Sequence, residues 1–304
     1  MSVMNRAAFR KQLQEGLNTV FGMEYKRYSL EYRTIFETTS SVKAYEEDVL
    51  LAGLAGAPVK PEGAPITYDS GAEAYTARYV HETIALAFSL TEEAEEDALY
   101  GDIGSKYARA LARSMVHTKE VKGSAVLNNG FSATFPGGDG VALFATNHPL
   151  WGGGTQSNTF TTQADLSETS MEEACIQISK WVDERGINIA VVPLRLIIPT
   201  DLTFVAERIL ASQFRPGTAD NDINALKSKG KIPGGSHENH RLTDPNAWFL
   251  ITDCMDGLKH MIRKNIQRGV EGDFETGNMR YKSRERYSFG WSDYRGAFAS
   301  SGTA

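Results

Sequence analysis

Residues 91–131, TEEAEEDALYGDIGSKYARALARSMVHTKEVKGSAVLNNGF, decide the architecture of this chain. Thr91 can cap a short helix over 92–97, whose acidic side chains suit the positive end of the helix dipole. Gly101 and Gly104 are expected to interrupt that helix, and a longer helix is predicted from Ser105 to Asn129. At about 1.5 Å per residue it would run for about 37 Å, whereas globular helices average about 11–12 residues. We therefore expect this helix to serve as a spine for the fold.

The faces of the predicted spine differ in polarity. Apolar or small side chains recur at steps of three and four, at Ile103, Tyr107, Leu111, Met115 (or Ser114), Thr118, Val121 and Ala125. Basic side chains occupy the other faces, at Lys106, Arg109, Arg113, Lys119 and Lys122. This pattern is typical of an amphipathic helix packed against a sheet. The basic residues are interpreted as a solvated face that pairs with neighbouring carboxylates, in preference to a nucleic-acid contact.

Length and composition bound the remaining possibilities. A chain of 304 residues normally forms two domains, or one with large excursions. Its net charge of −6 argues against non-specific nucleic-acid binding, which requires a basic patch. Cys175 and Cys254 are too few for a disulfide framework, so both are expected to be reduced. The basic N-terminus lacks the apolar core of a signal peptide, and no stretch is long and apolar enough to cross a membrane. We expect a protein made in the cytosol.

The first 90 residues predict a projecting arm. A helix is expected over 4–21, extended chain over 28–44, and an irregular Gly- and Pro-rich segment over 50–66. A short strand is expected at 66–68, with a turn at 69–71. Residues 74–90 then contain no breaker, and as one strand they would span about 56 Å, far longer than usual. The simplest interpretation is a hairpin arm anchored near Thr83, which needs a partner surface because it has no core of its own.

Residues 170–252 predict a compact α/β domain. Ser170 and Glu173 suggest a capping box for a helix over 170–182, with Gly186 as its stop signal. A buried strand is predicted over 189–198, then a helix from 202 capped by Thr200 or Asp201. A polar loop over 212–244 and a strand over 248–252 complete the block. The tail, 256–299, is predicted to form strands that carry many charged side chains.

The sequence offers no credible catalytic constellation, and no catalytic, cofactor-binding or metal-binding residue is predicted. His237 and His240 are assigned to a surface loop, and His81 and His117 to structural roles. His148 could act as a base, but no nucleophile elbow accompanies it, so a histidine that fixes the turn before Pro149 is favoured. The glycine runs at 137–140 and 152–154 lack the context of a phosphate loop and are interpreted as flexible connections. The acidic run at 92–97 could hold a cation, although its place at a helix N-terminus explains it without one.

Several segments, in order, resemble those of the Mu-like major head subunits, which are tailed-phage major capsid proteins of the Hong Kong 97 type. The resemblance is carried by GAPITYDSGAEAYTARYVHETIALAFSLTEEAEEDALYGDIG, LFATNHPL, ADLSETSMEEA, VVPLRLIIPTDLTFVAERILAS, GTADNDINALKSKG, LTDPNAWFLITD and RYSFGWSDYRGAFAS. Together these segments span about residues 63 to 299. Residues 1–60 match less well, since VLLAGLAGAPVKPEG replaces the usual stretch before the loop.

This resemblance implies an α+β fold of the Hong Kong 97 capsid type with five parts. Residues 1–44 would form the N-terminal arm and the strand that leads into the loop, and 45–83 the extended β-hairpin loop. Residues 84–160 would form the peripheral domain with its long spine helix, and 161–256 the α/β axial domain. Residues 257–304 would supply C-terminal strands that return to the peripheral domain.

The implied function is self-assembly into pentamers and hexamers that form an icosahedral shell around double-stranded phage DNA. The expected partners are further copies of the chain, a separate scaffolding protein, a portal and a decoration protein. Packaged DNA would be met only by non-specific proximity, and no membrane is expected. The location would be the virion capsid, assembled in the host bacterial cytoplasm. Lys60 is the only lysine between 44 and 105, so a covalent cross-link through this loop is not expected.

Three alternatives remain open at this point. A nanocompartment shell of the same fold would enclose enzyme cargo instead of DNA. A hydrolase would use His148 with a nearby carboxylate and is not the favoured interpretation, so the chain is expected not to be an enzyme. An oligomeric binding protein would form a small ring without closing into a shell.

Overall fold

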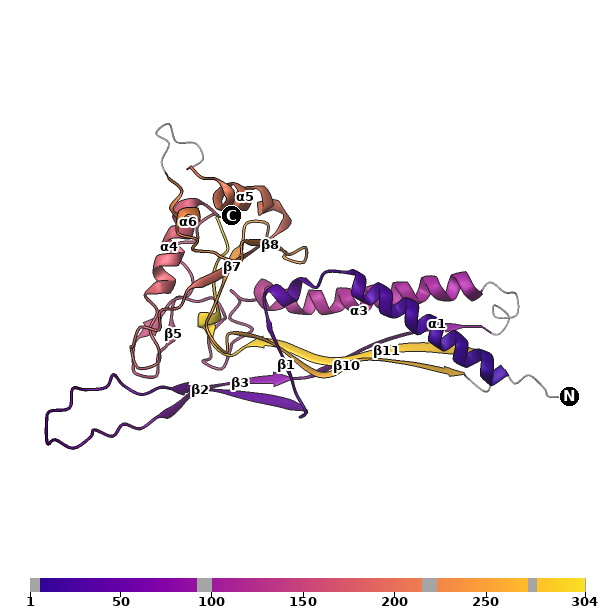
Figure 1. The fold of residues 1–304 in the computed structure, drawn as a ribbon, viewed down its shortest axis with the longest axis horizontal. Helices are drawn as coiled ribbons and strands as arrows, with labels where there is room; N and C mark the ends of the chain where they lie inside the picture. The colour runs from indigo at the N-terminus through magenta and orange to yellow at the C-terminus, as the bar shows by residue number, and fades with distance from the viewer. Residues whose placement is uncertain (1–5, 92–99, 215–222, 273–277, 304) are drawn as a thin grey trace.

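A computed structural model describes residues 6–91, 100–214, 223–272 and 278–303, and for 6–14 and 100–103 it describes the backbone only. Figure 1 shows an elongated part built on a long sheet, a compact α/β part above one end of it, and a thin arm below. The expected α+β class is confirmed. No helix among the described residues is both long and apolar enough to cross a membrane.

The long sheet has the strand order β1-β10-β11-β4. β1 (Glu37–Ser40) pairs in parallel with β10 (Leu258–Gly272), and β11 (Met279–Trp291) runs antiparallel to both β10 and β4 (Glu82–Leu90). Along β11, side chains from Met279 to Tyr287 alternate between buried and exposed because successive residues point to opposite faces. The buried face meets two helices, and the other face is crossed by the base of the arm (Figure 1).

The spine helix is α3, Tyr100–Asn128. It passes through Gly101 and Gly104, so the expected interruption there is wrong, while the proposed cap and acidic helix at 91–97 lie largely outside the described residues. The buried face is also rotated from the predicted stripe. Tyr107 and Val121 are exposed; the buried side chains are Ala108, Leu111, Ala112, Met115, Val116, Lys119, Glu120, Ser124 and Leu127. Both α1 and the long sheet pack against this helix, and the side chains that face these two neighbours are the ones that are buried.

The N-terminal helix, α1 (Arg6–Arg27), lies along the spine (Figure 1). Leu17 and Phe21 bury their side chains with Leu111 of the spine and Tyr281 of β11. It continues beyond the predicted end at 21. The next segment contains a 3-10 helix, Glu31–Thr34, before β1, so 28–44 is extended only in part.

The arm consists of β2 (Tyr45–Ala52) and β3 (Ala72–Val80), paired antiparallel. The predicted 17-residue strand over 74–90 is divided at His81: β3 belongs to the arm and β4 to the long sheet. The unusual length of the predicted strand is thereby explained, because the chain passes from one sheet to the other at His81. The expected strand at 66–68 is wrong; residues 53–71 form no strand or helix.

The compact part contains the sheet β12-β9-β7-β8. Its strands are Ala297–Ser300 (β12), Trp248–Thr252 (β9), Pro193–Ile198 (β7) and Ser236–Glu238 (β8), and its helices are Glu168–Ser179 (α4), Thr203–Ala211 (α5) and Ala225–Ser228 (α6). The core between sheet and helices includes Met171, Ile178, Leu196, Trp248 and Phe298. β12 lies beside β9, so the last strand of the chain enters this sheet and not the long one.

Local signals in this part are displaced from their predicted positions. The capping box of α4 joins Ser167 and Ser170, three residues earlier than expected, and the helix ends before Gly186. Gly186 instead has a φ of 83° in a separate turn. β7 begins at Pro193 because the chain turns at Ala190, which has a φ of 52°. A 3-10 turn over Thr200–Leu202 leads into α5 without a side-chain cap.

A shared core joins the two parts. Leu127 at the end of the spine, Phe144 and Tyr32 pack with Phe249 of β9 and Leu258 of β10. The end of the spine and both sheets therefore meet in one apolar cluster, which fixes the compact part over one end of the elongated part.

Candidate functional site: the arm and the polar network at its base

The base of the arm is held by a set of specific polar contacts. His81, at the division between β3 and β4, lies between two hydroxyls: its Nε2 is 2.8 Å from Ser41 Oγ and its Nδ1 is 3.0 Å from Ser288 Oγ. Burial lowers the pKa of His81 below its usual value. Tyr79 contacts Ser292 through its hydroxyl (2.6 Å). The end of β3 is thereby attached to β11 and the residue after it, and His81 also joins it to Ser41, which precedes β2.

Three glycines allow the arm base to pack closely. A Cβ on Gly137 would lie 2.1 Å from the Trp291 ring, and one on Gly138 would lie 2.6 Å from the backbone oxygen of Thr76 in β3. A Cβ on Gly290 would lie 2.7 Å from the Tyr79 ring. The interpretation of Gly137–Gly140 as a flexible connection is therefore wrong for its first two residues, which are close-packed against the arm and the long sheet.

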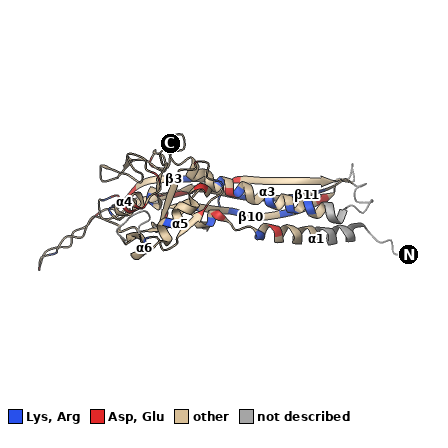
Figure 2. Cartoon of the chain, turned by 90° about the horizontal axis from the view of Figure 1, so that it is seen from above, with Lys and Arg blue, Asp and Glu red and all other residues tan. Residues whose placement is uncertain are grey.

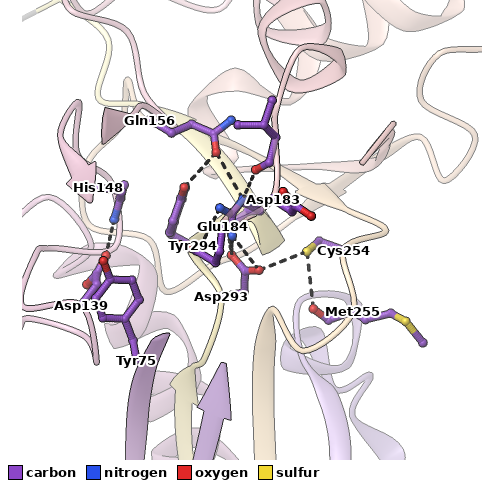
Figure 3. A network of polar contacts seen from close by, with 12 residues as sticks. Tyr75, Asp139, His148, Gln156, Asp183, Glu184, Cys254, Met255, Asp293 and Tyr294 are labelled. Carbon is purple, nitrogen blue, oxygen red and sulfur yellow. Dashed lines mark hydrogen bonds and ion pairs between the residues drawn. The ribbon is translucent and has the colours of Figure 1, made fainter. Parts of the chain in front are cut away.

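A buried network of charges lies beside the arm base (Figure 3). The guanidinium of Arg295 binds Glu184 (2.8 Å) and Asp293 (3.2 Å), and its Nε donates to the Val182 carbonyl and to Gln156. Burial by itself would lower the pKa of Arg295, but Asp293 and Glu184 outweigh burial and raise it. Gln156, Glu184 and Arg295 come from segments far apart in the chain, so no local sequence motif predicts the network.

His148 belongs to the same region. Its side chain is fully buried, its Nδ1 is 2.6 Å from Asp139 Oδ2, and its Nε2 is 3.2 Å from Asn158 Oδ1. The ring stacks on Tyr294 at 3.9 Å. Both ring nitrogens are engaged and no edge of the ring faces solvent, so the geometry supports the structural role and gives a substrate no access to this histidine.

His237, His240 and both cysteines also lie outside any arrangement that would indicate catalysis. His237 lies in β8 and not in a loop, and exposed His240 contacts Glu31 at 2.8 Å. Cys175 is buried and both cysteines are free. Within the part of the chain that the structure describes, no three His, Cys, Asp or Glu side chains are grouped as a metal site would require.

The spine contains a buried ion pair that the sequence did not indicate. Lys119, assigned to a solvated face, pairs with Glu285 of β11 and also donates to Tyr25 Oη of α1 (2.7 Å). Arg113 and Lys122 pair with carboxylates, Glu24 and Glu82, as expected of the basic side chains, and Figure 2 shows the basic residues distributed along α3 and β11. Only the alternation of β11, with glutamate at a buried position, could have suggested a buried partner.

Glu120, the next residue of the spine, predicts a pH dependence. Burial raises its pKa to about 7, although the Tyr32 backbone N–H, 3.0 Å away, acts in the opposite direction. A carboxyl whose folded pKa is raised destabilises the fold as pH rises from the unfolded value, about 4.3, to about 7. Glu120→Gln should therefore stabilise the unassembled protein by about 3 kcal/mol at pH 8 and by almost nothing at pH 4. Urea unfolding at the two pH values tests this; an equal gain at both would contradict it.

Beyond its base, the arm ends in a loop with exposed apolar side chains. We call residues 54–69 the arm loop. Its apolar members are Leu54 (60% exposed), Val59 (94%), Ile66 (68%) and Tyr68 (93%). All four belong to one exposed loop, and exposed apolar surface that gathers in one region is typical of interaction sites in soluble proteins. The loop extends beyond the body of the subunit (Figure 1), so these side chains are positioned to contact another molecule.

Comparison with known proteins supplies the family context. Residues 73–300 match the model of a family described as phage capsid protein. No curated protein matches the chain significantly. Among solved structures, the fold is similar to the capsid of an empty GTA particle (TM-score 0.59, 11% identity, covering 90% of this chain and 89% of that one). It is also similar to a virus-like particle from Pyrococcus furiosus (TM-score 0.54, 11% identity, covering 95% of this chain and 97% of that one). A third similar structure is the procapsid of bacteriophage JBD30 (TM-score 0.53, 16% identity, covering 98% of this chain and 76% of that one). At these identities the structures establish a shared fold.

Proposed function

The chain belongs to the phage capsid protein family, and from this premise we propose that its copies assemble into pentamers and hexamers that close an icosahedral shell around double-stranded DNA. It is a major capsid protein, a component of the virion shell. The observation that carries the proposed mode of assembly is the arm loop, whose exposed apolar side chains are supported by no core of their own. A second copy of the chain is the partner that such a loop requires.

The physical basis is the burial of the loop on a neighbour. Burying one large apolar side chain is worth about 1.5–3 kcal/mol, so each arm contributes a modest contact. In a closed shell every copy both offers an arm and receives one, and closure under symmetry leaves no unsatisfied surface. Many modest contacts then sum to a lasting assembly.

The two parts of the fold suggest two roles. We assign the long sheet with α3 to the peripheral domain, the compact α/β part to the axial domain around the symmetry axes, and residues 45–83 to the loop that crosses a neighbour. The particular likeness to Mu-like head subunits is part of this proposal, as are a scaffolding protein, a portal and a decoration protein as partners. DNA would be met without specific contacts, which the net charge of −6 supports. Assembly would take place in the host bacterial cytoplasm.

The direct test is negative-stain electron microscopy of the purified protein, with sedimentation in parallel. We expect closed particles tens of nanometres across, or pentamers and hexamers that close when a scaffolding protein is added. A monomer or dimer that persists at high concentration with scaffold present would contradict the proposal, and a small ring that never closes would favour the binding-protein alternative. The contents of the particles separate a phage head, which holds DNA, from a nanocompartment, which holds protein cargo.

A further inference from the structure

We propose that Arg185 is a positioning residue for assembly, which ties both ends of the arm loop to the body of its own subunit and so presents the loop, already shaped, to a second copy. This inference rests on the proposed function. Arg185 lies in the compact part, more than 100 positions along the chain from the arm that it holds.

The contacts of Arg185 close the loop at its base. Its Nε donates to the Gly53 carbonyl (3.2 Å) and its Nη2 to the Ser70 carbonyl (2.6 Å), the two residues that flank the arm loop. Asp69 strengthens the same closure: its carboxylate accepts from the Ala55 and Ser70 amides, both at 2.8 Å. These backbone hydrogen bonds lower the pKa of Asp69. One side chain thus joins the chain just after the end of β2 to the chain just before the start of β3.

Arg185 is itself held in place. It lies in a tight turn in which Asp183 Oδ1 accepts from the Arg185 and Ile187 amides, both at 2.8 Å. Its guanidinium lies over the Trp151 ring, 4.5 Å from the centroid, and its side chain is only 18% exposed. The neighbouring Glu184 accepts from the Trp151 amide (2.8 Å) and pairs with buried Arg295. The buried network, part of which Figure 3 shows, therefore includes Glu184, the residue next to Arg185, and through it the backbone of Trp151.

The effect expected of this closure is preorganisation. Residues 53–71 have no regular structure, and ordering a residue costs about 1–2 kcal/mol of conformational entropy. A loop that is already shaped in the free subunit loses less entropy when it binds, which strengthens association without any new contact. The planar guanidinium fork can bond two separate carbonyls while it stacks on an indole, whereas a lysine ammonium cannot reproduce that geometry.

The test compares Arg185→Ala and Arg185→Lys with wild type, with Arg208→Ala as a control that removes the same charge from an exposed position on α5. Hydrogen exchange of the arm-loop amides is measured in unassembled protein, and light scattering gives the threshold concentration for assembly. We expect exchange of those amides to be about tenfold faster in Arg185→Ala, with the spine amides unchanged. The assembly threshold should rise about tenfold, with Arg185→Lys between the two and Arg208→Ala like wild type.

The outcomes distinguish a positioning role of Arg185 from direct contact with the neighbour and from failure of the proposed function. If assembly of Arg185→Ala is impaired while loop exchange is unchanged, Arg185 contacts the neighbour directly and the positioning role is wrong. If loop exchange rises but the threshold does not move, preorganisation is irrelevant to assembly and the inference is again overturned. If wild type itself forms no shells under any condition, the proposed function fails, and that result is read from wild type alone.

Discussion

Replacement of residues 54–69 by Asn-Gly is expected to abolish shell formation and leave the remaining fold intact. The structure allows this deletion to be narrow, because β2, β3 and His81 are bonded to the body and belong to the folded subunit. Asn-Gly favours a tight turn, and together with Gly53, Ser70 and Gly71 it would connect β2 and β3 by a short loop. Only the segment that has no apolar core of its own is then removed, so loss of assembly would report loss of the contact with a neighbour.

Two measurements check this expectation. Circular dichroism and urea unfolding should show a folded subunit within about 1 kcal/mol of wild type, because exposed loops contribute little to stability. Electron microscopy should show monomers or free capsomers and no shells. A matched control replaces Thr67, which is exposed and polar, by Ser, and should assemble normally; Val59→Ser with Tyr68→Ser should be impaired. Normal shells from the deletion would show that the arm loop is dispensable.

The second large effect is expected at the buried ion pair between α3 and β11. Lys119→Met should destabilise the subunit by about 3–5 kcal/mol, because it leaves the Glu285 carboxylate buried without its charge partner. Burial raises the pKa of Glu285, whereas Lys119 and the Tyr25 hydroxyl lower it. Removal of the lysine leaves only the Tyr25 hydrogen bond to oppose the effect of burial. The urea midpoint of the unassembled protein at pH 7.5 measures the change.

A double variant separates pairing from packing. Lys119→Met with Glu285→Gln removes both charges and keeps similar volumes, so most of the lost stability should return. Lys122→Met is the matched single control, since the Lys122–Glu82 pair lies on the surface and such pairs are worth about 0–1 kcal/mol. Equal effects of Lys119→Met and Lys122→Met would show that burial of the first pair does not matter.

The spine shows what sequence periodicity can predict and what it cannot. A helix over 105–129 was predicted and Tyr100–Asn128 is observed, because steps of three and four specify a helix whatever it packs against. The same periodicity placed Lys119 in solvent and Tyr107 and Val121 in the core, and both assignments are wrong. A helix with small and apolar residues on several sides has no single buried face until its neighbours are known.

In the arm, too, the sequence predicted the element but not the contacts that place it. Strand-length limits led to the prediction that 74–90 belongs to a projecting hairpin arm anchored near Thr83. The position of the change, His81, depends on contacts with Ser41 and Ser288, which are distant in the chain. The arrangement around Arg185 could not be predicted from the sequence, because its two hydrogen-bond acceptors in the arm are backbone carbonyls, and backbone acceptors exist at every position.

The sequence by itself determined the long spine helix, the projecting hairpin, the strand at 248–252 and, through the order of its segments, the capsid family. These features depend on local periodicity, turn residues and chain length, all of which act over short separations. Tertiary structure alone decided which side of the spine is buried, that β12 joins the compact sheet, and which charges meet: Lys119 with Glu285, Arg295 with Glu184, Arg185 with the arm. The physical reason is that a buried charge is tolerated only beside its partner, and these partners lie more than 100 positions apart.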